Sequence, residues 1–152
     1  MNKKSSRLKP IEKLAEDKEK SAIAEMVSAR NTQQSQQQKL NDLMSYRFEY
    51  IEQFQSRGKN GMQSSQVQQY QQFISQLDVA IRQQETTLEM SVKILDESQN
   101  KWRDKNSHKR ALNKVVRRYK SEEFRALEKT EQNAVDEQNT QKYNQKNREN
   151  NS

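Results

Sequence analysis

The sequence predicts an all-α fold, an antiparallel two-helix coiled-coil hairpin whose second helix overhangs the first and is followed by a disordered C-terminal tail. Three observations lead to this fold class: a seven-residue apolar repeat, a low content of hydrophobic residues, and one short segment that contains both glycines. Only 30% of the 152 residues are hydrophobic, whereas a globular domain has about 45–50%. A seam with two apolar positions in seven needs only that smaller fraction, so the composition favours a coiled coil over a filled globular core.

The apolar repeat lies in the second half of the chain. Every seventh position from 67 to 102 is apolar; the residues are Val67, Ile74, Ile81, Leu88, Leu95 and Trp102. Such a sustained repeat keeps one narrow seam on a helix and favours supercoiling against a partner helix. The alternate inner positions are Tyr70, Leu77, Gln84, Ser91 and Ser98. The second helix, expected over about 65–135, therefore has a seam that is apolar near its start and more polar further on.

The first half of the chain supplies the partner helix, expected over about 8–56. Its apolar residues lie mostly three or four positions apart, and Pro10 falls where a first helical turn tolerates proline. The segment 57–61 then holds Gly58 and Gly61, which predicts a turn over about 57–64 because glycine adopts the left-handed conformation easily. Ser65 and Gln68 have the spacing of a capping box for the second helix.

A short connection between two long helices predicts an antiparallel pair. Folding the chain about Gly61 sets Gln37 opposite Gln84 and Leu8 opposite Leu112, so the second helix should continue without a partner past about Leu112. The hairpin is expected to be a single domain over 8–135. Residues 136–152 are rich in Asn, Gln, Lys and Glu, a composition typical of a disordered tail.

The residue types needed for catalysis or metal binding are scarce. The chain has one histidine, His108, and no cysteine, so neither a metal site nor an activated nucleophile is expected. No glycine loop follows a strand to hold a phosphate, and neighbouring carboxylates such as Glu122 and Glu123 have no predicted pocket around them. We expect no catalytic residue, no cofactor and no metal, and hence no enzyme.

The positive charge is concentrated in one stretch. The formal net charge is +7, and between Lys101 and Lys120 a run of basic residues is opposed by Asp104 alone. A solvated helix face explains such a run most simply, an acidic protein partner comes next, and nucleic acid comes last because few aromatic platforms accompany the charges. No apolar run follows the basic N-terminus, so we expect neither a signal peptide nor a membrane span, and a cytoplasmic location.

The aromatic residues near the turn exceed what a two-helix seam requires. Tyr46, Tyr50, Phe73 and Leu77 either widen the seam or form a docking patch, and the two interpretations are equally well supported. Aromatic residues at helical spacing are most often packed, whereas exposed aromatic residues are strong anchors in interfaces.

Three strings carry a resemblance to a known family. They are LMSYRFEY at 43–50, YQQFISQL at 70–77 and WRDK at 102–105, separated by the glycine-bearing turn. Together they resemble the FliJ family of flagellar type III export proteins, over roughly Leu8 to Leu127.

The resemblance implies a stalk-like hairpin of the bacterial export apparatus. Family members insert their terminal helices into the ring of the flagellar export ATPase, promote its assembly, contact the cytosolic linker of the export gate and handle export chaperones. The gate-binding patch of the family carries over to Leu43, Tyr46, Tyr50, Phe73, Leu77 and Ala80. The chain departs from the family pattern at Lys39, where a glutamine is familiar, and at Gln84, where a histidine is.

For the ring we expect contacts from the cationic segment, with Arg110, Arg117 and Arg118 as candidates. The chain alone should be a monomer, bind no nucleic acid, and reach the cytoplasmic face of the inner membrane peripherally, through the export apparatus. Two other classes of function stay open: a structural homodimeric coiled coil, and a basic coiled coil that binds nucleic acid.

Overall fold

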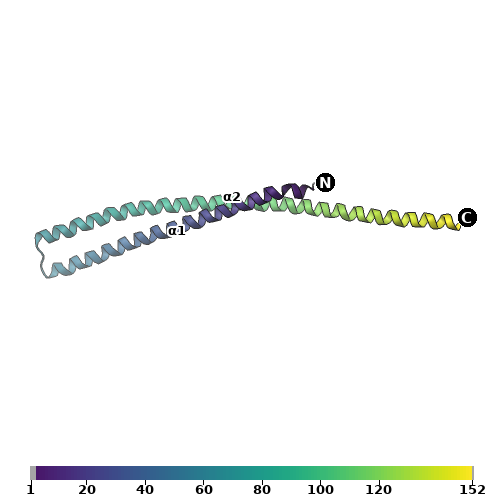
Figure 1. Ribbon diagram of the computed structural model, residues 1–152. Coiled ribbons are helices and arrows are strands. Elements are labelled where there is room, and N and C mark those ends of the chain that lie inside the picture. The colour runs from purple at the N-terminus through teal and green to yellow at the C-terminus, as the bar shows by residue number, and fades with distance from the viewer. Residues whose placement is uncertain (1–2, 152) are drawn as a thin grey trace. The chain divides into compact units, whose positions relative to one another are not determined.

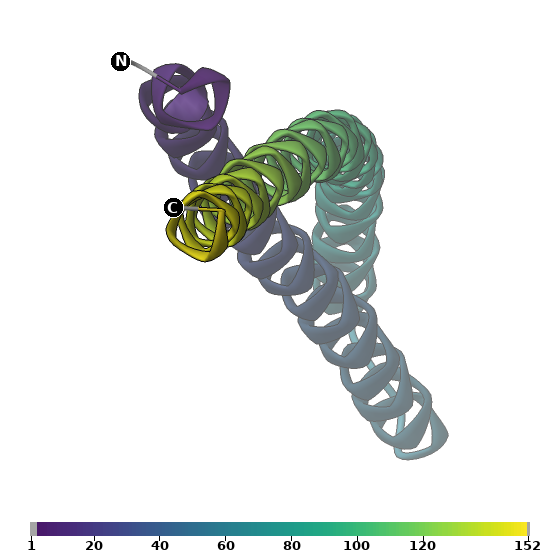
Figure 2. The same cartoon turned by 90° about the vertical axis from the view of Figure 1, so that its right-hand side faces the viewer.

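The computed structural model describes residues 3–151 and consists of two long helices (Figures 1 and 2). α1 spans Lys4–Lys59 and α2 spans Ser64–Asn150, and residues 3–151 contain no strand. Both helices are continuous ribbons joined at the teal turn in Figure 1. The predicted all-α helical hairpin is therefore confirmed.

The N-terminus of α1 differs from the prediction. The helix begins at Lys4 rather than near Leu8, so Pro10 lies inside it and not in its first turn. The earlier start has a physical cause: Glu123 of α2 accepts hydrogen bonds from both the backbone N–H of Ser5 (3.1 Å) and the Ser5 hydroxyl (2.7 Å). An acceptor for the free amides of a first helical turn stabilises that turn.

The turn between the helices uses one of the two glycines in the way expected. Gly61 has φ of +88°, a conformation that glycine adopts without strain, and its N–H donates to the carbonyl of Gly58 (3.2 Å). Gly58 itself remains in α1. The predicted cap from Ser65 and Gln68 is wrong: the Gln66 side chain accepts from the Gln63 N–H (3.3 Å), so the cap lies two residues earlier.

Internal contacts divide the chain into two units. The turn unit is Glu19–Lys105, and the terminal unit combines Met1–Lys18 with Asn106–Ser152, of which residues 3–18 and 106–151 are described. In both units a segment of α1 packs against a segment of α2. The single domain over 8–135 stays a prediction.

In the turn unit, the most deeply buried residues of α2 occupy the alternate inner positions of the heptad repeat and not the positions of the apolar repeat itself. Tyr70, Leu77 and Ser91 are buried at 6–8% exposure, whereas the heptad residues from Val67 to Trp102 are half-buried. The facing helix contributes Ala22 and Ala29, which are 2% and 9% exposed. The small side chains of α1 therefore face the part of α2 in which the alternate inner positions are serines.

A polar layer crosses the middle of the turn unit. The Gln84 amide donates to both the backbone carbonyl (2.9 Å) and the side-chain oxygen (2.7 Å) of Gln36. The sequence predicts Gln37 at this level, so the observed partner differs by one residue. Further along the seam, the Trp102 indole N–H donates to Glu19 (3.1 Å), which satisfies the polar atom of a half-buried ring.

In the terminal unit the two helices pair further than predicted. Val116 is 3% exposed and Ala15 4%, the Lys4 ammonium lies 5.4 Å from the centre of the Tyr119 ring, and the contact of Ser5 with Glu123 follows. Pairing thus reaches Glu123 instead of ending near Leu112. From residue 124 to 151 every residue is exposed, as expected for an overhang.

The expected disordered tail is not observed, because α2 continues to Asn150. The chain has no glycine or proline after Gly61, and residues 136–150 are mostly Gln, Glu, Lys, Arg and Asn. The first four of these types have high helix propensity, and nothing in the segment interrupts the backbone hydrogen bonds of the preceding turns. No helix among residues 3–151 is long and apolar enough to cross a membrane.

Candidate protein-docking site

Five aromatic rings from both helices meet near the turn. The ring cluster consists of Tyr46, Tyr50 and Phe54 of α1 with Tyr70 and Phe73 of α2. Tyr50 lies at its centre, with ring centroids 4.2 Å from Phe73 and 5.0 Å from Tyr70. Tyr46 contacts Phe73 edge-on at 5.9 Å, and Phe54 lies 5.3 Å from Tyr70. Such tilted and edge-to-face pairs each contribute about 0.5–1.5 kcal/mol beyond the area they bury.

The ring cluster has a buried side and an exposed side. Tyr70 is 8% exposed and belongs to the seam, whereas Tyr46 is 49% exposed. Tyr50 and Phe73 are half-buried between them. The inner rings therefore widen the seam, and the outer edge presents an exposed aromatic surface, at which docking stays a prediction.

The other residues of the predicted gate-binding patch divide in the same way. Leu77 is 7% exposed, so its side chain supports the ring cluster from within the seam and offers little surface to a partner. Leu43 and Ala80 are half-buried. All six predicted residues lie in the turn unit.

A hollow of about 470 Å³ adjoins Tyr46 at the exposed edge of the ring cluster. Leu43 and Tyr46 line it together with Lys39, Asp42 and Gln84. The two positions where the chain departs from the family pattern, Lys39 and Gln84, are thus both part of this hollow. A partner side chain seated there would meet an ammonium group and an amide at its edge.

An ion pair beside the ring cluster was not predicted. The Arg47 Nε donates to the Asp78 carboxylate at 2.6 Å, and both side chains are about 40% exposed. The sequence signal for this pair is the opposite charge of Arg47 and Asp78 on the two helices. Predicting the pair from that signal requires a helix register that is accurate to within one turn. A partly exposed pair of this kind contributes at most about 1 kcal/mol.

The candidate ring contacts lie in the other unit. Arg110, Arg117 and Arg118 are exposed on α2 in the terminal unit. The Arg118 guanidinium lies 5.6 Å from the Tyr119 ring centre, and the other two side chains extend from exposed positions. These arginines belong to a different unit from the ring cluster.

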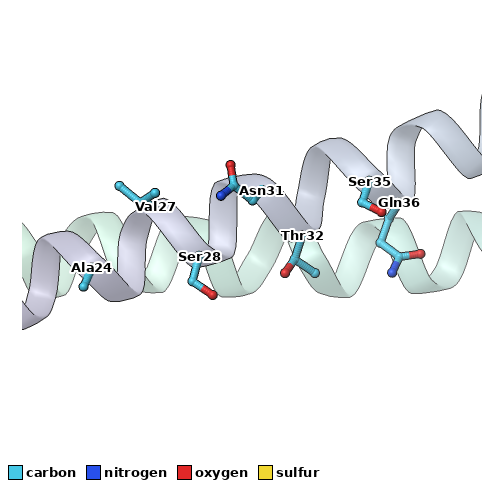
Figure 3. A pocket seen from close by; sticks show the side chains of 7 residues that line it. All are labelled: Ala24, Val27, Ser28, Asn31, Thr32, Ser35 and Gln36. Carbon is cyan, nitrogen blue, oxygen red and sulfur yellow. The ribbon is translucent and has the colours of Figure 1, made fainter.

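Among residues 3–151 no set of three or more His, Cys, Asp or Glu side chains lies close enough to hold a metal ion, and His108 is exposed. A separate open depression of about 700 Å³ runs along α1 from Ala24 to Gln36 (Figure 3). Small, apolar and uncharged polar side chains line it, with no acid or base among them.

Comparison with known proteins assigns the chain to a family. The family model described as flagellar FliJ protein matches residues 3–148, which extends beyond the strings that first suggested it and includes most of the C-terminal helix. A search of curated proteins finds no significant match. Since the match covers nearly the whole chain, this protein belongs to the FliJ family and is a component of the flagellar export apparatus.

Proposed function

We propose that the protein links two parts of the flagellar export apparatus. The turn unit docks on the cytosolic linker of the export gate, and the terminal unit engages the export ATPase ring and promotes its assembly. The observation that carries this proposal is the ring cluster, whose exposed edge adjoins an apolar hollow. Handling of export chaperones and a peripheral position at the inner membrane complete the proposal, and membership of the FliJ family supports them.

The ring cluster suits docking for an energetic reason. A half-exposed aromatic edge held in place by neighbouring rings loses little side-chain freedom on binding, so most of the gained contact contributes to affinity. Tyr46 is 49% exposed and contacts both Tyr50 (6.3 Å) and Phe73 (5.9 Å) between ring centroids. Interface anchors of this type often cost 2 kcal/mol or more when truncated to alanine.

Gate docking is tested by Tyr46→Ala, with Phe48→Ala as its matched control. Phe48 is 63% exposed and forms none of the ring contacts described, so its loss removes an exposed aromatic of similar size from the same helix. Pull-down with the isolated gate linker should show about thirtyfold weaker capture for Tyr46→Ala and little change for Phe48→Ala. Equal capture by both variants, with unchanged helical circular dichroism, would refute gate docking through this edge.

Ring engagement is tested by replacing Arg110, Arg117 and Arg118 together with glutamine. The matched control replaces Lys20, Lys59 and Lys93, which are exposed in the turn unit, so both triple variants lose the same charge. At low salt the arginine variant should stimulate assembly of the export ATPase less than the wild type, and the lysine control should match the wild type. Equal stimulation by all three proteins would argue against a ring contact here.

A further inference from the structure

The net charge of the protein resides in one of its two units. The turn unit contains 11 basic and 11 acidic residues and is neutral, whereas the terminal unit contains 17 basic and 10 acidic residues and carries the whole +7. The sequence shows a basic run on α2, but the structure adds the basic N-terminal segment of α1 to it. Segments 3–18 and 106–125 together hold 13 basic and 5 acidic residues.

Within this unit, lysines surround an apolar hollow. The hollow has a volume of about 340 Å³ and is lined by Lys3 and Lys9 of the N-terminal segment and by Lys120, Phe124 and Leu127 of α2. Phe124 and Leu127 are 62% and 53% exposed, so two large apolar side chains stand beside three ammonium groups. Ser5, Ser6 and Glu123 complete the lining.

The acid in the hollow does not cancel its positive charge. Glu123 accepts hydrogen bonds from the hydroxyl and the backbone N–H of Ser5, which hold the pKa of its carboxyl below the ordinary value. The hollow therefore has one carboxylate, which is hydrogen-bonded to the first turn of α1, and three lysine ammonium groups. The surface is therefore cationic with an apolar centre.

We propose that this surface binds anionic phospholipid directly, so that the terminal unit has an affinity for a membrane of its own. Clusters of four to eight basic residues near a membrane gain about 1 kcal/mol for each Lys or Arg, and exposed Phe and Leu side chains add affinity by entering the boundary of the acyl chains. The inference goes beyond the proposed function, since it requires neither the gate nor the ATPase.

The residue types favour lipid over a protein partner. Specific protein interfaces are enriched in Arg and depleted in Lys, and the three cations around this hollow are all lysines. A flexible lysine side chain loses less conformational entropy when its ammonium group contacts mobile lipid headgroups than when a protein partner fixes it in one geometry.

They also favour lipid over nucleic acid. Binding of single strands relies on rings that are free to stack with bases, but Lys4 and Arg118 both lie against the Tyr119 ring, at 5.4 and 5.6 Å. Phe124 is the single aromatic residue lining the hollow, and it has an apolar neighbour, Leu127, that fits an acyl chain better than a base.

The test is co-sedimentation of the full-length chain with two kinds of vesicle, phosphatidylcholine alone and phosphatidylcholine mixed with phosphatidylglycerol. The wild type should sediment with the mixed vesicles only, and less so as salt rises to about 0.15 M. The triple variant Lys3→Gln, Lys9→Gln and Lys120→Gln should bind about a hundredfold more weakly, from about 1 kcal/mol for each lysine.

Two control variants separate a local surface from overall charge. The turn-unit triple variant Lys20→Gln, Lys59→Gln and Lys93→Gln has the same net charge and should lose less than about threefold, whereas Phe124→Ser with Leu127→Ser should lose about tenfold without changing net charge. Circular dichroism reports whether each variant remains helical.

Three outcomes would overturn the proposal: equal binding to both kinds of vesicle, equal losses in the two lysine variants, or tighter binding to a single-stranded oligonucleotide than to mixed vesicles at the same salt. The last would identify nucleic acid as the partner. None of them bears on gate docking, which is measured on Tyr46 in the other unit.

Discussion

Replacing Leu77 with alanine should destabilise the turn unit without removing a surface contact. The side chain is 7% exposed, so truncation beyond Cβ removes its buried methine and two methyl groups. At about 0.8 kcal/mol for each buried carbon group the loss is about 2 kcal/mol. The value belongs at the low end of the 2–5 kcal/mol range for Leu→Ala because a seam between only two helices can close partly around the cavity.

Urea unfolding followed by circular dichroism at 222 nm measures this loss, with Val79→Ala as the control. Val79 is 47% exposed, so its truncation should change the free energy of unfolding by less than about 0.5 kcal/mol. Gate capture by Leu77→Ala should be normal at low urea, where the turn unit is still folded. A stability equal to the wild type, together with lost gate capture, would show that Leu77 contacts the partner directly.

Three further predictions concern association, the polar layer and the N-terminal contact. Light scattering should give a monomer of 18.1 kDa; a dimer at micromolar concentration would contradict the intramolecular hairpin. Changing Gln36 and Gln84 together to leucine should raise the free energy of unfolding by about 1 kcal/mol but increase dimer formation, because buried polar residues specify register and oligomeric state at a cost in stability. Acidification should lower the protection factor of the Ser5 amide, which compares its hydrogen exchange with the intrinsic rate at the same pH. The pKa of Glu123 is lowered by its hydrogen bonds from Ser5, so its stabilisation exists above the ordinary carboxyl range and is lost as pH falls through the lower folded value. Alanine at position 123 should abolish that pH dependence, and an unchanged profile would contradict it.

Much of the fold follows from sequence because its determinants are local and periodic. A seven-residue repeat is sufficient to predict a seam on α2, and a glycine at the end of a periodic run predicts the turn, since Gly61 must adopt a positive φ. Together these two features set the antiparallel register to within one residue at Gln84. The composition of residues 136–150 is typical of a disordered tail, but several of the same residue types also favour the uninterrupted helix that these residues form.

The candidate site was predicted less completely. Four members of its predicted patch, Tyr46, Tyr50, Phe73 and Leu77, do gather near the turn, but their individual exposures differ and spacing along a helix does not reveal them. A side chain on the flank of a seam is buried or exposed according to the size of its neighbours on the other helix. The contact of Arg47 with Asp78 likewise depends on how one helix lies against the other, which spacing along a single helix does not reveal.

The sequence by itself determined that this chain forms two helices, where it turns, and which residue types border the turn, because backbone propensity and heptad spacing act over a few neighbouring residues. Only the tertiary structure decided which half of each seam is buried, which aromatic edge faces outward, and that lysines from the N-terminal segment join those near Lys120 around one apolar hollow. Those features depend on pairs of residues from different helices, such as Tyr50 with Phe73 and Ser5 with Glu123, and their contacts are set by packing between helices rather than by either helix alone.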